Sequence, residues 1–187
     1  PVPRERIVEV ADGAVLALAG REFRFIDVPG HARHHVAIVD GATGHVFAGD
    51  TFGISYRALD AGGRCFVFPT TSPSQFDPGL LHDSIDRIVS LGPAAIYVTH
   101  FSKILDVRRL SEDLHRLIDA HVELALAHRR AGAERHELLR DGVRDLLVSE
   151  GKRQGWALSG APLLERISLD IELNAQGLGA WLDALPE

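Results

Sequence analysis

Apolar and polar residues follow one another in short runs over the first hundred residues, and turn-forming residues separate the runs. The apolar-rich runs are RIVEV (6–10), AVLALA (14–19), FRFIDV (23–28), HVAIVD (35–40) and HVFAGD (45–50). Short β-rich runs with Gly- and Asp-containing turns between them are typical of antiparallel strands. We predict a meander of antiparallel strands, with two further strands in CFVFP (65–69) and AAIYVTH (94–100).

The periodicity becomes helical between the last two predicted strands. Asp77 is a favourable N-cap, and Pro78 suits the first helical position. Gly92 and Pro93 then end the segment. One face of the predicted helix is apolar, because four residues recur at helical spacing: Leu81, Ile85, Ile88 and Val89.

After residue 105, apolar residues recur at the spacing of amphipathic helices. We predict four helices in SEDLHRLIDAHVELALAHRR (111–130), AERHELLRDGVRDLLVSEG (133–151), APLLERISLDIEL (161–173) and GLGAWLDAL (177–185). The first of them begins with a serine that could cap it. The change of pattern predicts two regions, an α/β (α+β) region over residues 1–105 and a helical accessory region over residues 106–187.

Composition narrows the classes of partner. The 187 residues carry a net charge of −6, which argues against a basic surface for nucleic acid. No apolar run approaches the roughly 20 residues that cross a bilayer, so we expect no membrane span. Cys65 is the single cysteine, so no internal disulfide can form, and we expect a cytoplasmic protein.

Three side chains with metal-binding atoms stand at the ends of predicted strands. His35 heads one strand, Asp50 closes the next, and His100 ends AIYVTH. Strand ends can converge at one edge of a sheet, and imidazole and carboxylate are good ligands for Zn²⁺ and similar ions. The alternative is that Asp50 is a turn residue and that these histidines, like the others in the chain, are surface or packing residues.

In order and spacing, VPGHARHHVAIVD, GHVFAGDT and AIYVTH resemble the third, fourth and fifth motifs of the metallo-β-lactamase fold superfamily. The resemblance implies that His35 binds the first metal, that Asp50 bridges two metals, and that His100 binds the second. It implies no metal role for His31, which would lie in the turn. One departure from the motif is His34, where the family often has glycine.

The resemblance also implies a fold and a reaction. The fold would be an αββα sandwich, and the reaction would be hydrolysis of an ester, thioester, lactone or similar bond in a small-molecule substrate. A hydroxide bound to a divalent metal, zinc by the resemblance, would attack that bond. Asp50 would be the catalytic residue that holds both metals, and Tyr56 would contact the substrate.

The superfamily's His-x-His-x-Asp-His motif is absent from this sequence. The chain therefore resembles the C-terminal half of the sandwich followed by a helical tail. We expect an incomplete metal site, an inactive isolated chain, and pairing with the missing N-terminal half or with a second copy. Two alternatives remain: a non-catalytic assembly module with relic ligands, and a di-iron redox protein on the same fold.

Overall fold

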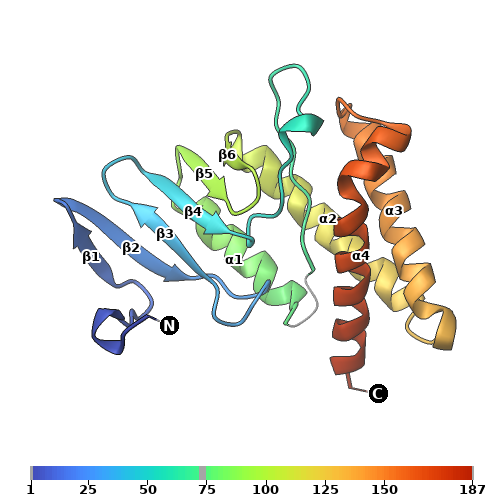
Figure 1. Ribbon diagram of the computed structural model, residues 1–187, viewed down its shortest axis with the longest axis horizontal. Helices are drawn as coiled ribbons and strands as arrows, with labels where there is room; N and C mark the ends of the chain where they lie inside the picture. Colours follow the sequence, from blue (N-terminus) through green and yellow to red (C-terminus); the bar gives the residue numbers. More distant parts are fainter. Residues whose placement is uncertain (1, 72–74, 187) are drawn as a thin grey trace.

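The computed structural model describes residues 2–71 and 75–186 and shows a mixed α/β fold, as predicted. Its sheet has the strand order β1-β2-β3-β4-β5-β6 (Figure 1). The strands are β1 (Val15–Leu18), β2 (Arg21–Asp27), β3 (Val36–Asp40), β4 (His45–Gly49), β5 (Ala95–Val98) and β6 (Ser102–Ile104). β4 and β5 are parallel and the other neighbours are antiparallel, so the predicted meander is confirmed for β1 to β4.

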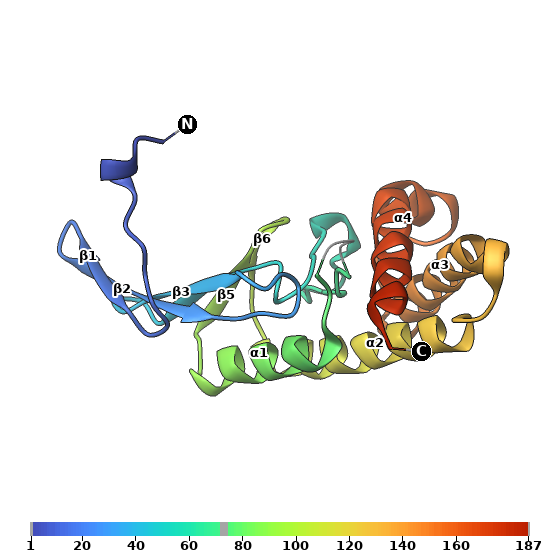
Figure 2. The ribbon, with the colours of Figure 1, turned by 90° about the horizontal axis from the view of Figure 1, so that it is seen from below.

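Helices cover one face of this sheet and extend beyond its edge. The longer ones are α1 (Pro78–Ser90), α2 (Val107–Ala127), α3 (Arg135–Gln154) and α4 (Gly160–Ala184). Short 3₁₀ turns occupy η1 (Arg4–Arg6), η2 (Arg57–Leu59) and η3 (Gly132–Glu134). α1 and α2 lie against the same side of the sheet, and α3 and α4 stand together at one end of it (Figure 2). Within the described ranges, no helix is both long and apolar enough to cross a bilayer.

The helix α1 forms as its sequence predicts. The carboxylate of Asp77 accepts the backbone N–H of Leu80 at 3.0 Å, which satisfies a donor at the helix start. Leu81, Ile85 and Ile88 are buried in the main hydrophobic core. The turn before β3 packs tightly on this helix, because a Cβ on Gly30 would lie 2.3 Å from the Leu81 backbone nitrogen. Only glycine permits this approach.

Two of the predicted strands are wrong. Residues 6–10 form no strand, and Ile7 and Val8 are exposed next to η1. Residues 65–69 make a single bridge, between Phe68 and Ile54, although Phe66, Val67 and Phe68 are fully buried. A short apolar run becomes a strand only where a neighbouring backbone offers a ladder of hydrogen bonds, and the run itself does not reveal whether one exists.

The helix boundaries also differ from the prediction. α2 begins at Val107, so Ser111 lies inside the helix and does not cap it. The helices predicted at 161–173 and 177–185 are one continuous helix, α4, which ends at Ala184. Gly177 and Gly179 do not break it, because tertiary packing of α4 against α3 outweighs the weak helix propensity of glycine.

The hydrophobic core is continuous across the predicted boundary at residue 105. The same cluster contains Ile96 of β5, Leu114 of α2, Val143 of α3 and Leu178 of α4. The helical region is therefore packed into the core that begins in the sheet. The division into regions 1–105 and 106–187 stays a prediction about chain organisation.

The other face of the sheet carries an uncovered apolar row. Adjacent cross-strand partners form this row, which consists of Phe25, Ile38, Phe47 and Tyr97. Their chain neighbours point to the opposite, helix-covered face and are buried: Ile26, Ala37, Val46 and Ile96. Phe47 remains 43% exposed, and its ring stacks on Tyr97 with centroids 4.9 Å apart. Apolar side chains of this kind normally pack against a second layer of secondary structure, so this face of the sheet is suited to such a layer.

His121 is a titratable side chain in the core of α2. It is fully buried, and its Nδ1 donates to the Leu117 carbonyl at 2.7 Å. Among the described residues, its Nε2 has no hydrogen-bond partner. Burial lowers the pKa of the imidazole, and the hydrogen bond to Leu117 only partly opposes this effect. The folded protein therefore holds His121 neutral.

This burial predicts acid sensitivity. Below pH ~6.5 the unfolded chain binds a proton at His121 that the folded chain does not, so the free energy of unfolding falls as pH falls. The loss continues down to the lowered folded pKa and is absent above pH ~6.5. Urea unfolding at pH 7.5 and 5.5 should show that wild type loses up to about 1.4 kcal/mol more than His121→Leu. Equal losses in both proteins would contradict a neutral, buried His121.

Candidate metal site at the strand ends

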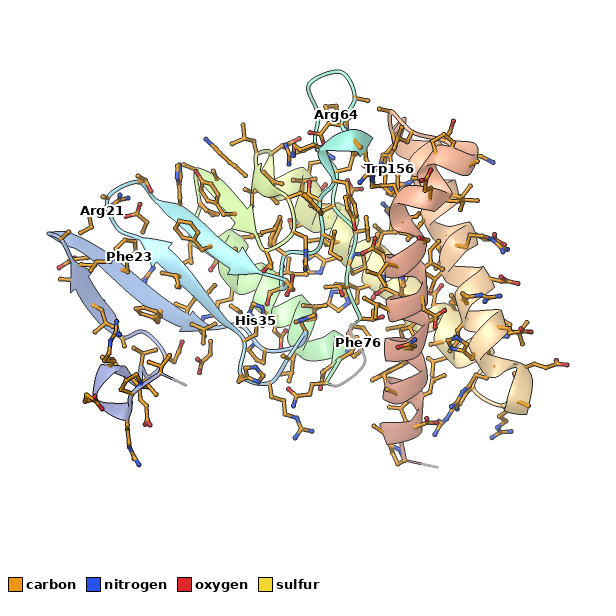
Figure 3. All side chains as sticks on the ribbon, viewed as in Figure 1. Arg21, Phe23, His35, Arg64, Phe76 and Trp156 are labelled. Atoms are coloured by element: carbon orange, nitrogen blue, oxygen red, sulfur yellow. The ribbon has the colours of Figure 1, made fainter. Side chains whose placement is uncertain are left out.

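The three predicted ligands lie at one end of the sheet. Asp50 directly follows β4, and His100 lies two residues after the parallel strand β5, so both stand at carboxyl ends. β3 runs antiparallel to β4, which places His35, just before β3, at the same end. Figure 3 shows His35 at the end of the sheet that faces α4. The topology therefore brings together side chains that are up to 65 positions apart in sequence (100 − 35).

Two imidazoles face the two oxygens of a single carboxylate. His31 Nε2 lies 3.7 Å from Asp50 Oδ2, and His100 Nε2 lies 3.6 Å from Asp50 Oδ1. Both distances exceed the usual hydrogen-bond range. Asp50 Oδ1 is buried and, within the described ranges, accepts no hydrogen bond. A buried carboxylate oxygen without a donor is costly, and a cation between these groups would satisfy it.

His35 contacts the backbone of the same aspartate. Its Nε2 accepts the Asp50 backbone N–H at 3.2 Å, and its Nδ1 lies 3.3 Å from Thr51 Oγ1. The Thr51 hydroxyl donates its one proton to the Val28 carbonyl at 3.0 Å, so it accepts the Nδ1 proton of His35. Both ring nitrogens of His35 are therefore occupied. The imidazole holds the Asp50 backbone in place.

The protonation state of His35 agrees with this arrangement. Burial lowers the pKa of its imidazole, and the nearby His31 lowers it further, while Asp50 acts in the opposite direction. A neutral ring with its proton on Nδ1 has the free Nε2 lone pair that the Asp50 N–H requires.

Gly49 makes room for the His35 ring. Its φ is +57°, and a Cβ at this position would lie 2.3 Å from His35 Cε1. A larger residue would push the imidazole away from the Asp50 backbone. The glycine of the GDT turn thus has a steric role in addition to its backbone conformation.

Tyr56 lies beside the site but uses its hydroxyl to bind α4. The hydroxyl donates to Asp170 Oδ2 at 2.9 Å. The ring packs against the ring of Phe101, the residue after His100, with the two centroids 4.7 Å apart. Burial raises the pKa of Tyr56 to about 12, and the hydrogen bond to Asp170 is the second largest cause of this rise. Burial also raises the pKa of Asp170, and the Tyr56 bond and the charge of His100 partly offset this. Contact of Tyr56 with a substrate stays a prediction.

A second polar contact attaches α4 to the loop after the site. The Thr71 backbone N–H donates to Asn174 Oδ1 at 2.6 Å, and the Thr71 hydroxyl donates to the Asn174 carbonyl at 3.0 Å. Asp170 and Asn174 were not identified from the sequence. The sequence did contain a signal, since both residues lie four positions apart on the helix face that also carries Ile167 and Leu178. Polar side chains on such an apolar face are buried and need hydrogen-bond partners.

The donor set fits a divalent metal but does not complete a site. Imidazole nitrogen and carboxylate oxygen suit Zn²⁺ and its neighbours. Within residues 2–71 and 75–186, no three such side chains converge closely enough to hold one ion. The carboxylate of Asp50 lies between His31 and His100, which suits a bridging ligand that has further donors on each side.

Comparison with known proteins identifies the family. A family model described as the metallo-beta-lactamase superfamily matches residues 1–100. The metallo-beta-lactamase fold-containing protein ST1585 of Sulfurisphaera tokodaii is 29% identical over 97 residues, which are 52% of this chain and 33% of that protein. A hydroxyacylglutathione hydrolase of Xanthomonas axonopodis pv. citri is 39% identical over 82 residues, covering 44% of this chain and 26% of that enzyme. The chain thus spans about a third or less of the length of these relatives.

Solved structures extend the similarity beyond the motifs. The metallo-beta-lactamase family protein TTHA1429 of Thermus thermophilus aligns with a TM-score of 0.53 at 27% identity, over 68% of this chain and 40% of that one. The crystal structure of ST1585 aligns with a TM-score of 0.50 at 20% identity, over 95% of this chain and 53% of that one. The fold of ST1585 therefore includes counterparts of the helical tail. Because the family model covers more than half of its residues, the chain belongs to the metallo-β-lactamase superfamily.

Proposed function

We propose that this chain supplies part of the active site of a metal-dependent hydrolase. The observation that carries the proposal is that His31 and His100 face the two oxygens of Asp50, one of which is buried and accepts no hydrogen bond from the described residues. An aspartate between two imidazoles can link two metal ions, each of which needs more donors than residues 2–71 and 75–186 bring to it. We infer zinc as the metal from this ligand chemistry.

The ligands that the geometry favours are His31, Asp50 and His100. His31 directs Nε2 toward Asp50, whereas both nitrogens of His35 bind groups of the protein itself. We therefore assign His35 a positioning role, in place of the ligand role that the sequence predicted. Its hydrogen bond to the backbone N–H fixes the carboxylate that follows.

The chain's own residues would orient and enclose the reacting groups. A divalent metal at this site supplies a water nucleophile at neutral pH and polarises the bond that is cleaved. Asp50 is the catalytic residue, because it holds the metal site together. Tyr56 and Asp170 place α4 beside His100, so the helical tail forms one wall of the site.

A thioester is the substrate class that we propose. The relative that is 39% identical over 82 residues is named a hydroxyacylglutathione hydrolase. The substrates of that enzyme are proposed for this chain only as a class, a small acyl thioester. Esters and lactones are the competing classes on this fold.

We also propose that a further polypeptide segment covers the open face of the sheet and brings the remaining ligands. Phe47 and Tyr97 present a stacked apolar pair on that face, and the matched structures are about twice as long as the portion they share with this chain. Burying apolar area stabilises by about 25 cal/mol per Å², so an apolar face of several hundred Å² strongly favours a covering partner.

The ligand assignment predicts different effects for two histidines. His31→Ala should weaken Zn²⁺ binding at least about 10-fold, since it removes a ligand. His35→Ala should instead lower the free energy of unfolding by about 1–3 kcal/mol, because two hydrogen bonds are lost. Calorimetric titration with Zn²⁺ and urea unfolding measure the two effects. Intact Zn²⁺ affinity in both His31→Ala and Asp50→Asn would contradict the proposed site.

The open face predicts self-association or co-purification with a covering segment. Sedimentation velocity at micromolar concentration should show species larger than one chain. Phe47→Lys should reduce this association, because a charge would replace an aromatic ring on the sheet face. Leu169→Lys is the matched control, since Leu169 is an exposed apolar residue on α4. A wild-type chain that sediments only as a monomer would contradict the proposal.

The proposed reaction predicts where activity appears. The zinc-loaded assembled fraction should hydrolyse a hydroxyacylglutathione thioester, and the monomeric fraction should not. Asp50→Asn should reduce the rate at least about 100-fold, because Asp50 is a proposed metal ligand and the loss of a mere supporting group already costs about 10–100-fold. Thiol release is followed spectrophotometrically, with a lactone as the competing substrate. Equal rates for the wild type and Asp50→Asn would refute the catalytic assignment.

A further inference from the structure

A second pair of histidines lies between two helices of the outer layer. His82 projects from α1 and His115 from α2, and their Nδ1 atoms are 2.5 Å apart. Both side chains are 26% exposed. α1 and α2 run side by side under the sheet (Figure 2). The pair therefore belongs to the helical layer, and none of the strand-end residues His31, Asp50 and His100 takes part in it.

The two rings meet edge to edge. Their planes differ by 12°, and their centroids are 4.8 Å apart. This separation equals the distance between the two Nδ1 atoms plus about one ring radius on each side. The Nδ1 atoms must therefore lie almost on the line between the centroids, and the rings are nearly coplanar. In this geometry the in-plane orbitals of the two nitrogens point at each other.

Each imidazole is oriented by a carboxylate on the opposite helix. His82 Nε2 lies 3.0 Å from Asp119 Oδ1, and His115 Nε2 lies 3.0 Å from Asp86 Oδ1. An ionised carboxylate only accepts hydrogen bonds, so both Nε2 atoms carry protons. In the neutral tautomers, both Nδ1 atoms then bear lone pairs. Two lone pairs cannot face each other at this distance, so either a shared proton or a metal ion belongs between the two Nδ1 atoms.

We propose that His82 and His115 bind a divalent transition-metal ion through their Nδ1 atoms and that this ion clamps α1 to α2. Imidazole is a preferred ligand of Zn²⁺, Ni²⁺ and Cu²⁺. A carboxylate that accepts the other ring N–H is the usual support of a metal-binding histidine, and here Asp119 and Asp86 supply it to both rings. Water completes the coordination, since both rings border solvent.

The pair needs only a small movement to accept the ion. Two nitrogens bound to one tetrahedral zinc at about 2.0–2.1 Å are roughly 3.3 Å apart. The rings would therefore separate by less than about 1 Å, which small side-chain rotations provide at a partly exposed site. A site with two protein donors binds more weakly than a closed structural zinc site with four.

The test is a Zn²⁺ titration in a background that lacks the strand-end site. The Asp50→Asn/His100→Ala variant removes two of the proposed strand-end ligands. Any Zn²⁺ that it binds can therefore be assigned to the His82–His115 pair, and the two proposed sites are tested separately. This protein should bind one Zn²⁺ per chain, and its thermal midpoint should rise by a few degrees in excess Zn²⁺. Adding His82→Ala or His115→Ala should abolish both effects. His136→Ala, which removes a half-exposed histidine on α3, should change neither.

Two conservative variants and ¹⁵N NMR distinguish Zn²⁺ binding at the histidine pair from a general loss of structure. Asp86→Asn and Asp119→Asn keep a hydrogen-bond acceptor but remove its charge, and each should weaken Zn²⁺ binding about 10-fold. In ¹⁵N NMR of the imidazoles, Zn²⁺ should shift the Nδ1 signals of His82 and His115 together while both Nε2 atoms stay protonated. Unchanged Zn²⁺ binding in both histidine variants would overturn the proposal. Absence of Zn²⁺ binding, with a proton shared between the Nδ1 atoms instead, would overturn it as well.

Discussion

The strand-end site depends on one hydrogen bond, from the Asp50 backbone N–H to the His35 imidazole. It sets the direction of a carboxylate that must face His31 and His100 at the same time. The bond requires a neutral ring with its proton on Nδ1, which Thr51 accepts, and it requires glycine at position 49, where any Cβ would strike the ring. His35, for which the motif predicts a ligand role, thus binds the Asp50 backbone, and Nε2 of His31, four residues earlier, points toward the Asp50 carboxylate.

The helical tail has a direct connection to this site. Asp170 and Asn174 lie one turn apart on α4 and bind Tyr56 and Thr71, which belong to the segment after the GDT turn. Buried polar contacts of this kind specify orientation, because a misplaced helix would leave the carboxylate and the amide unpaired. The helix that closes one side of the site is therefore set by polar pairing as well as by apolar packing. The similarity of ST1585 over 95% of the chain agrees with a tail that is part of the fold.

Helices cover one face of the sheet and leave apolar side chains on the other face partly exposed. Ile26, Ala37, Val46 and Ile96 are buried under helices, whereas the row that contains Phe47 and Tyr97 faces outward. A sheet with apolar residues on both faces belongs between two layers. The covering segment that we propose would serve both the site and the sheet, because it would bring further donors to the strand-end residues and a second layer to the face that carries Phe47 and Tyr97. By contrast, the His82–His115 pair lies within the helical layer and needs no such partner.

The sequence by itself determined the elements with strong local signals. Alternating runs gave β2, β3 and β4, the Asp77-Pro78 cap gave the start of α1, and ordered motifs indicated the superfamily. The tertiary structure alone decided where local signals compete: residues 66–69 are buried but form only one bridge, from Phe68 to Ile54, and α4 continues through Gly177 and Gly179. It also decided which histidine faces Asp50 and brought His82 to His115 across 33 residues. Side-chain direction and long-range pairing depend on the packing of distant segments, and no local pattern of residues contains that information.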